Sequence, residues 1–242
     1  MNNGTDPTNY NSLNAEIQKS FRNDGGFALD VKAVVPPGIS ILFGQSGAGK
    51  TTLLECIAGL SAPDAGRITL GERVLFDSAR AIHIAPQDRR IGYVFQSLAL
   101  FPHLSVEQNL SYGLHHLKKP EQTELVYQVL KSFRIEHLAR RTPDRISGGE
   151  RQRTAFARSL VIKPSLLLLD EPLSALDEAT KQGIMDDLLR WNVSHPIPII
   201  YVTHSYHEAF AMGKQMIVLS AGKVLVTGPP EKAFEEFKKA VI

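Results

Sequence analysis

A stretch rich in glycine, GQSGAGKT at residues 44–51, matches the pattern G-x-x-x-x-G-K-[ST]. It lies between the apolar run ISILF and the helix-like segment TLLECIAGL, which is the strand, loop and helix order that the pattern requires. Its glycines allow backbone N–H groups to close around phosphate oxygens, Lys50 adds a cation, and the Thr51 hydroxyl can bind magnesium. We therefore predict a phosphate-binding loop. The residues expected to form it are Gly44, Gln45, Ser46, Gly47, Ala48, Gly49, Lys50, Thr51 and Thr52.

Two adjacent carboxylates follow the apolar residues of LLLLDEP, at residues 166–172. Magnesium keeps several water ligands and takes only one or two protein carboxylates, so Asp170 suffices as its ligand. Side chains alternate in direction along a strand, and we expect Glu171 to point elsewhere, where it could accept a proton from an attacking water. The alternative is that both acids cap the following helix. A phosphate-binding loop in the same chain favours the catalytic interpretation.

Two further polar residues follow apolar runs, Gln96 after RIGYVF and His204 after IIYVT. A glutamine at a strand tip is often a solvated loop residue, and a histidine there is often an ordinary hydrogen-bonded one. Gln96 gains interest because it lies where the chain turns into a mostly helical region. His204 could reach a phosphate oxygen or hold a water. With His207 it could also bind zinc, but a zinc site needs further ligands.

A second glycine-rich turn, ISGGERQR at residues 146–153, opens a predicted helix. The free N–H groups at such a start, together with the helix dipole, favour an anion in front of Ser147, Gly148 and Gly149. Within one chain this site duplicates the loop at residues 44–51. The pattern therefore raises the question of which phosphate the second turn serves.

The elements that position these residues form an α/β pattern. Continuous apolar runs, typical of strands covered on both faces of a parallel sheet, lie at residues 39–43, 91–95, 166–170 and 199–203. Residues 13–36 predict an antiparallel edge sheet, and residues 101–162 predict a helical subdomain. The segment QMIVLSAGKVLVTG predicts a hairpin, and PPEKAFEEF begins a last amphipathic helix.

Local signals add detail to this pattern. A serine followed three residues later by Gln or Glu predicts capping boxes at Ser105, Ser147 and Ser205. The single cysteine, Cys56, excludes an internal disulfide, which fits a reducing compartment, and we expect its side chain in the core. The paired bases Arg89 and Arg90, like the other basic pairs, are expected on solvated faces.

Bulk composition narrows the class of protein. The chain has 242 residues, 27 basic and 25 acidic, so its net charge of +2 gives no strong field toward nucleic acid. Residues 1–12 are polar and predict a flexible tail, without the pattern of a signal peptide. No apolar stretch approaches the ~18 residues of a membrane helix, so any membrane role is expected to be peripheral.

The order of these motifs, with SALD at residues 174–177 added, resembles the nucleotide-binding domain of ABC transporters. The resemblance covers residues 13–242 and implies a P-loop NTPase (RecA-like) core. It implies that the loop around Lys50 binds ATP, that Thr51, Gln96 and Asp170 serve Mg²⁺, and that Glu171 is the general base. It further makes His204 the residue that senses the γ-phosphate and places Asp177 in a loop that couples two sites.

The same resemblance implies an aromatic ring that stacks on adenine. Phe21 stands at the expected distance before the phosphate-binding loop, and Phe27 is its rival. A core position in the edge sheet is the alternative for either ring.

Within this family, the string PQDRRIGYVFQ at residues 86–96 and LFPH at 100–103 are most similar to the ATP-binding subunits of molybdate importers. Sulfate, iron(III) and polyamine importers share much of this pattern, but usually carry an additional C-terminal β domain, which we do not expect here. The resemblance implies a cytoplasmic subunit on the inner face of the membrane. Its partners would be a second copy of itself, permease subunits reached through residues 98–103, and indirectly a solute-binding protein.

Two other interpretations are weaker. A soluble P-loop kinase would share only the loop and Asp170, and would have no use for a second anion-binding helix start. An ABC-type ATPase of DNA repair would carry a long insertion, whereas only about fifty residues separate Gln96 from Ser147. We therefore expect no nucleic-acid partner.

Overall fold

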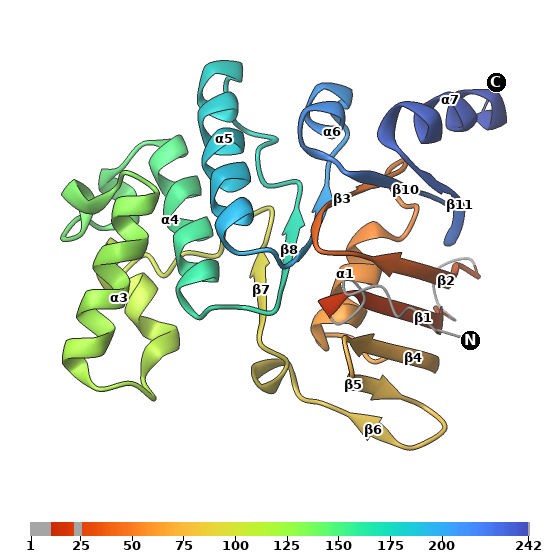
Figure 1. Cartoon of the computed structure of the whole chain (residues 1–242), viewed down its shortest axis with the longest axis horizontal. Coiled ribbons are helices and arrows are strands. Elements are labelled where there is room, and N and C mark those ends of the chain that lie inside the picture. The colour runs from red at the N-terminus through yellow and green to blue at the C-terminus, as the bar shows by residue number, and fades with distance from the viewer. Residues whose placement is uncertain (1–10, 22–25, 242) are drawn as a thin grey trace, which may run out of the picture.

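The computed structural model describes residues 11–21 and 26–241, and in them one eleven-stranded sheet runs through the chain in the order β6-β5-β4-β1-β2-β11-β10-β3-β9-β8-β7 (Figure 1). The strands are β1 Leu13–Ser20, β2 Ala28–Val35, β3 Gly38–Phe43, β4 Ala65–Leu70, β5 Arg73–Asp77, β6 Ile82–His83, β7 Ile91–Val94, β8 Leu166–Asp170, β9 Pro198–Val202, β10 Gln215–Ser220 and β11 Lys223–Gly228. The α-helices are α1 Lys50–Ala58, α2 Val106–Ser111, α3 Lys119–Ser132, α4 Gly148–Val161, α5 Glu178–Ser194, α6 Tyr206–Met212 and α7 Pro230–Val241.

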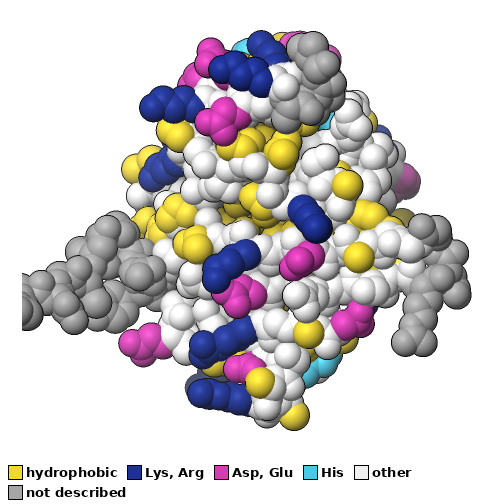
Figure 2. All heavy atoms as spheres, turned by 90° about the vertical axis from the view of Figure 1, so that its right-hand side faces the viewer, with side chains coloured by type: hydrophobic (Ala, Val, Ile, Leu, Met, Phe, Trp, Pro, Cys, Tyr) yellow, Lys and Arg dark blue, Asp and Glu magenta, His cyan; other side chains and the backbone are white. Residues whose placement is uncertain are grey.

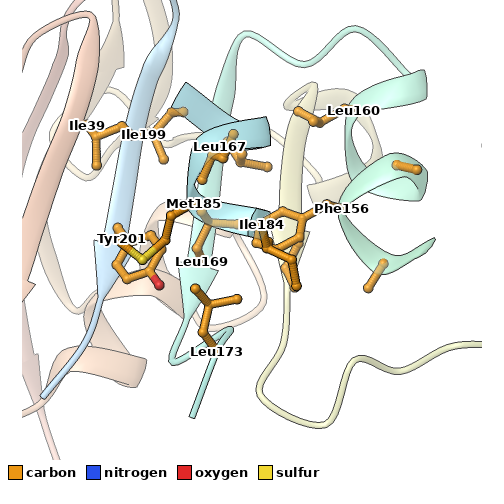
Figure 3. Packing of buried hydrophobic residues seen from close by; sticks show 14 of the residues in the cluster. Ile39, Phe156, Leu160, Leu167, Leu169, Leu173, Ile184, Met185, Ile199 and Tyr201 are labelled. Carbon is orange, nitrogen blue, oxygen red and sulfur yellow. The ribbon is translucent and has the colours of Figure 1, made fainter. Parts of the chain in front are cut away.

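Strands β10, β3, β9, β8 and β7 form the parallel half of the sheet. Every residue of β3, β8 and β9 is buried, as the continuous apolar runs predicted. On one face, Leu167, Leu169, Ile199 and Tyr201 pack against side chains of α4 and α5, including Phe156 and others labelled in Figure 3. The covered sheet holds the carboxyl ends of its strands in fixed relative positions.

The antiparallel half is larger than the sequence suggested. Besides β1 and β2, it contains β4, β5 and β6, which pair in antiparallel order next to β1. Strands β1 and β2 therefore lie inside the sheet and do not form its edge. Of the expected tail, residues 1–10 lie outside the described residues, and Ser12 is buried, with its carbonyl accepting from the Gly71 N–H.

The helices α2, α3 and α4 gather beside the parallel half, on the left of Figure 1. Short 3-10 helices join them at Tyr112–Leu114, Glu136–Leu138 and Pro143–Arg145. Phe133 at the end of α3 stacks near Phe156 of α4, with ring centroids 6.4 Å apart. The region predicted as helical, residues 101–162, thus contains helices that pack on one another.

Two of the three predicted capping boxes form completely, at Ser105 and Ser147. The third is wrong in one half. Ser205 accepts from the Glu208 N–H, but the Glu208 carboxylate accepts from the Tyr201 and Thr203 hydroxyls instead of returning to the helix start. The Ser205 N–H donates to the Thr203 hydroxyl oxygen at 3.0 Å instead, so it needs no bond from Glu208, whose carboxylate satisfies two buried hydroxyls.

Arg89 corrects another expectation, because its side chain is fully buried rather than solvated. Its guanidinium donates to the carbonyls of Cys56 and Ile57 at the end of α1, and to that of Ile84. Gly59 provides the space for this guanidinium, because a Cβ at that position would lie 2.6 Å from Arg89 Nε. A cation at a helix C-terminus meets the negative end of the dipole, so Arg89 caps α1.

The substitution Arg89→Met should therefore lower the free energy of unfolding by about 3 kcal/mol, because it leaves buried carbonyls without donors. For a chain of this size the thermal midpoint should fall by roughly 6–12 °C. Arg90→Met is the matched control, since Arg90 is exposed and should change stability by less than about 0.5 kcal/mol. Equal midpoints for the two variants in a thermal melt would contradict the capping role.

Basic and acidic side chains are interspersed on the face that Figure 2 presents. Lys32 of β2 and Glu16 of β1 form an ion pair in the antiparallel half of the sheet. Among the helices of residues 11–21 and 26–241, none combines the length and the apolar character needed to cross a membrane.

Candidate functional site

The loop at residues 44–51 connects β3 to α1 in a shape that demands glycine at two points. Gly44 has φ 155°, and a Cβ there would lie 2.2 Å from the Leu219 carbonyl oxygen. Gly49, with φ 100°, is the N-cap of α1 and packs against Phe27 and Leu29. The backbone is left-handed at Gly49, which a side chain resists. The loop therefore presents backbone N–H groups and the positive end of α1 to the same space.

Lys50 lies at the first turn of α1 and is only 7% exposed. Its Nζ donates to the carbonyls of Gly44 at 2.8 Å and Gln45 at 2.9 Å, which fold the side chain back over the loop. Burial lowers the pKa of Lys50, while the Glu171 and Asp170 carboxylates act in the opposite direction. The Lys50 side chain is thus held at the loop by two backbone carbonyls, with two acids nearby.

Thr51 and Asp170 meet across 119 residues of sequence, and the Thr51 hydroxyl donates to Asp170 Oδ2 at 3.0 Å. Asp170 ends β8 and is 8% exposed. Burial raises its pKa, and the hydrogen bond from Thr51 and the charge of Lys50 counteract this. A hydroxyl and a carboxylate side by side are the hard oxygen donors that magnesium prefers. The predicted metal residues therefore fit Mg²⁺ chemically.

Glu171 follows Asp170 but does not continue the strand, so the alternation used to predict its direction does not apply. It lies beyond the end of β8 with φ 46°, so a left-handed turn and not strand alternation sets its direction. Its carboxylate Oε1 lies 2.5 Å from His204 Nε2, just after β9. A left-handed non-glycine residue is a local strain that occurs often at active sites.

One cavity of about 580 Å³ gathers most of the predicted residues. It is lined by Phe21, Phe27, Ser46, Gly47, Gly49, Lys50, Thr51, Thr52, Gln96, Glu171 and His204. Both aromatic candidates are present, with ring centroids 6.0 Å apart, and Lys19 Nζ lies 5.3 Å from the Phe21 ring. Gln96 is two residues beyond the end of β7 and exposed. The cavity thus combines aromatic rings, a phosphate-binding loop and acidic groups.

The second glycine-rich turn does not line this cavity. Ser147 caps α4, accepting from the Glu150 N–H, and Glu150 Oε2 accepts from the Ser147 N–H at 2.7 Å. Hydrogen bonding to the Glu150 carboxylate from the Ser147 N–H, and then from the Ser147 side chain, lowers the pKa of Glu150. Gly148 instead borders a separate hollow of about 400 Å³. Within one chain the two glycine-rich turns border different hollows.

Asp177 lies outside the cavity too, as the N-cap of α5. Its Oδ1 accepts from the Thr180 N–H at 3.0 Å, and its Oδ2 from the Thr180 hydroxyl at 2.7 Å. Thr180 also touches the second turn, because a Cβ on Gly149 would lie 2.6 Å from its Cγ2. The starts of α4 and α5 therefore pack directly on each other.

Sequence reasoning missed the buried ion pairs that fasten α5 to its neighbours. Asp187 of α5 pairs with Arg153 of α4, and Lys181 of α5 lies 3.6 Å from Glu208 of α6. Glu208 also holds Thr203, the residue before His204. The one sequence pattern that included Glu208 was its spacing from Ser205, and that pattern predicted a capping box at the start of a helix. In the sequence, the charged residues of these ion pairs have the spacing of an exposed helix face, which does not predict that they are buried.

A model of the ABC transporter family matches residues 31–174. The chain belongs to the ABC transporter family. The molybdenum import ATP-binding protein ModC of Paramagnetospirillum magneticum is 43% identical over 210 residues, 87% of this chain and 58% of that protein. ModC of Rhizobium etli is 46% identical over 205 residues, 85% of this chain and 58% of that protein. This ABC chain thus spans less than two thirds of the length of both relatives.

Two solved ABC structures resemble the whole fold. The dimeric, post-hydrolysis state of the ATP-binding cassette MJ0796, bound to ADP and Pi, matches with a TM-score of 0.77 and 28% identity, covering 90% of this chain and 98% of that one. CbiO1 from Clostridium perfringens, part of the ABC transporter complex CbiONQ, matches with a TM-score of 0.80 and 29% identity, covering 96% and 94%. These matches confirm the predicted ABC family and its P-loop α/β fold.

Proposed function

We propose that this chain is the ATP-hydrolysing subunit of an ABC importer, with molybdate or tungstate as the solute. The observation that carries the proposal is the cavity lined by Lys50, Thr51 and the Glu171 and His204 pair, with Asp170 hydrogen-bonded to Thr51. The aromatic rings suit the base of a nucleoside triphosphate, and the phosphate-binding loop suits its phosphates. The acid next to a histidine suits hydrolysis of the outer phosphate. The two ModC relatives are named as molybdenum import ATP-binding proteins.

The roles of the side chains follow from their positions. Lys50 leaves the carbonyls of Gly44 and Gln45 to meet the outer phosphates of ATP. Glu171 accepts the proton of the attacking water as general base, and His204 holds Glu171 in place and contacts the γ-phosphate. Thr51, Asp170 and Gln96 would hold Mg²⁺, which when bound neutralises charge on the phosphate oxygens.

The second turn supports a site made by two copies of the chain. Ser147, Gly148 and Gly149 are absent from the lining of the cavity that contains Lys50. In a head-to-tail pair, the turn of each copy faces the γ-phosphate held by the loop of its partner, so each ATP lies between two chains. The MJ0796 cassette was solved as a dimer.

A groove on the helical region fits a permease segment. It has a volume of about 860 Å³ and lies between α2 and α3, with Tyr112 and Tyr127 on its walls. The two tyrosines are 63% and 53% exposed and give the groove an apolar wall that is open to solvent. Together with residues 98–103, the groove supports docking of permease helices, which places the subunit at the cytoplasmic face of the membrane. CbiO1 is part of a transporter complex.

The solute is tested by reconstitution with the permease. ATP hydrolysis should rise when the binding protein is loaded with molybdate or tungstate, and should stay at its basal rate with sulfate, iron(III) or a polyamine. If sulfate, iron(III) or a polyamine alone stimulated ATP hydrolysis, the chain would be assigned to an importer of that solute. No hydrolysis under any condition would contradict the ATPase assignment itself.

A separate prediction concerns the adenine-stacking ring. Phe21→Ala should raise the dissociation constant for ATP by about tenfold, because loss of stacking on a base costs ~1–3 kcal/mol. Phe27→Ala should have a smaller effect on ATP, since its ring already packs on Gly49. Binding of a fluorescent ATP analogue compares the two variants. A larger loss in Phe27→Ala would reassign the stacking ring.

A further inference from the structure

The segment that follows Gln96 has an unusual backbone. Leu98 has φ 61° and Ala99 has φ 46°. Among the described residues with positive φ, these are the two non-glycine residues that are adjacent in sequence. Left-handed backbone is unfavourable for residues with a Cβ, so such a turn persists only where neighbouring groups hold it.

Arg158 of α4 is the group that holds this turn. Its Nη2 donates to the Leu98 carbonyl at 2.9 Å and its Nη1 to the Ala99 carbonyl at 2.6 Å. Its guanidinium carbon lies 5.4 Å from the centroid of the Phe101 ring. A planar guanidinium can bind two carbonyls and stack on a ring at the same time, which a lysine cannot do.

The chain before this turn is held differently. Phe95 and Gln96 are exposed, and the Leu98 N–H donates to the Phe95 carbonyl at 2.8 Å. Gln96 therefore lies between the end of β7 and a turn clamped to α4. How the Gln96 side chain enters the cavity therefore depends on the position of the turn at Leu98 and Ala99.

We propose that Arg158 is a positioning residue, which holds the left-handed turn at Leu98 and Ala99 and thereby sets how Gln96 reaches the metal site. The role of the turn rests on the contacts above, and the role of Gln96 rests on the proposed function. Because Arg158 shares α4 with Ser147, the turn moves with the helix that carries the second anion-binding site.

Hydrogen exchange of the nucleotide-free chain tests the turn. Arg158→Met keeps an apolar stem but removes both donors, and the protected amides of Leu98 and Phe101 should exchange about tenfold faster. Ala99→Gly in the same background should bring the rate back toward wild type, because glycine adopts positive φ without a Cβ penalty. Ala81→Gly is the control, since Ala81 is also left-handed, with φ 51°, but lies between β5 and β6.

Unchanged exchange in Arg158→Met, or equal rescue by the control glycine, would overturn the proposal. If Arg158→Met does not fold, Arg158→Gln replaces it. The shorter carboxamide can serve one carbonyl at most, and an intermediate exchange rate that Ala99→Gly restores is expected.

A second measurement follows the metal without measuring hydrolysis. With ATP bound, Mn²⁺ titrated against the chain and followed by its free-ion EPR signal should bind about tenfold more weakly to Arg158→Met, whereas ATP affinity without metal stays unchanged. Ala99→Gly should restore Mn²⁺ affinity. Equal losses of ATP and Mn²⁺ affinity would overturn the positioning role. A wild-type chain that binds no ATP would contradict the proposed function, and the exchange experiment would still decide whether Arg158 holds the turn.

Discussion

Replacing Glu171 by glutamine should lower ATP hydrolysis by at least ~100-fold while the protein accumulates as an ATP-bound dimer. The amide keeps the size of the carboxylate and can still reach His204, which lies 2.5 Å from Glu171 Oε1. It cannot accept a proton from water, so the reaction stops after binding. Phosphate release and size-exclusion chromatography with ATP measure the two effects.

Glu178→Gln is the matched control for this experiment. Its side chain is 78% exposed on α5 and lies outside the cavity, so hydrolysis should keep its wild-type rate. Wild-type hydrolysis in Glu171→Gln would remove Glu171 from the role of general base. Lost hydrolysis without any ATP-dependent dimer would leave the base in place and contradict the two-chain arrangement.

The second large effect is expected from Ser147→Arg. Ser147 caps α4, and an arginine there fills the space in front of the helix start with a long side chain. ATP binding to the isolated chain should stay close to wild type, because Lys50 and its loop lie in a cavity that Ser147 does not line. Hydrolysis should fall by ~100-fold or more, as when a donor to a developing negative charge is removed.

Mixing this variant with Lys50→Ala distinguishes one chain from two. Each variant alone has no intact site. A mixed pair has one site with both defects and one site with neither, so an equimolar mixture should regain up to roughly a quarter of wild-type hydrolysis. A mixture that stays inactive, together with weakened ATP binding by Ser147→Arg, would assign Ser147 to the site of its own chain.

The sequence predicted the site best where chemistry depends on local order. The pattern at residues 44–51 requires a strand before it and a helix after it. The apolar runs before Asp170 and His204 predict parallel strands, whose carboxyl ends lie on the same side of the sheet. Glu171 marks the limit of such reasoning. Alternation along a strand was the wrong basis for its direction, because Glu171 lies beyond β8 in a left-handed backbone that has no local sequence signal.

Contacts between distant segments could not be predicted in this way. Strands β4 to β6 lack the continuous apolar runs of the parallel half, and their place beside β1 depends on pairing across the chain. Glu208 looked like a capping residue, whereas tertiary contacts with Tyr201 and Thr203 claim its carboxylate. Arg158 resembled any basic residue of an amphipathic helix. In each case the partner is far away in sequence or belongs to another element.

Arg89 changes what the string PQDRRIGYVFQ can tell about transport. Its guanidinium closes the far end of the same helix that begins at Lys50, and it fits there because Gly59 has no side chain. Any relative that ends this helix in the same way needs the arginine, whatever solute it carries. Arg89, one residue of the string most similar to molybdate importers, therefore serves the scaffold, and its presence alone does not identify a solute.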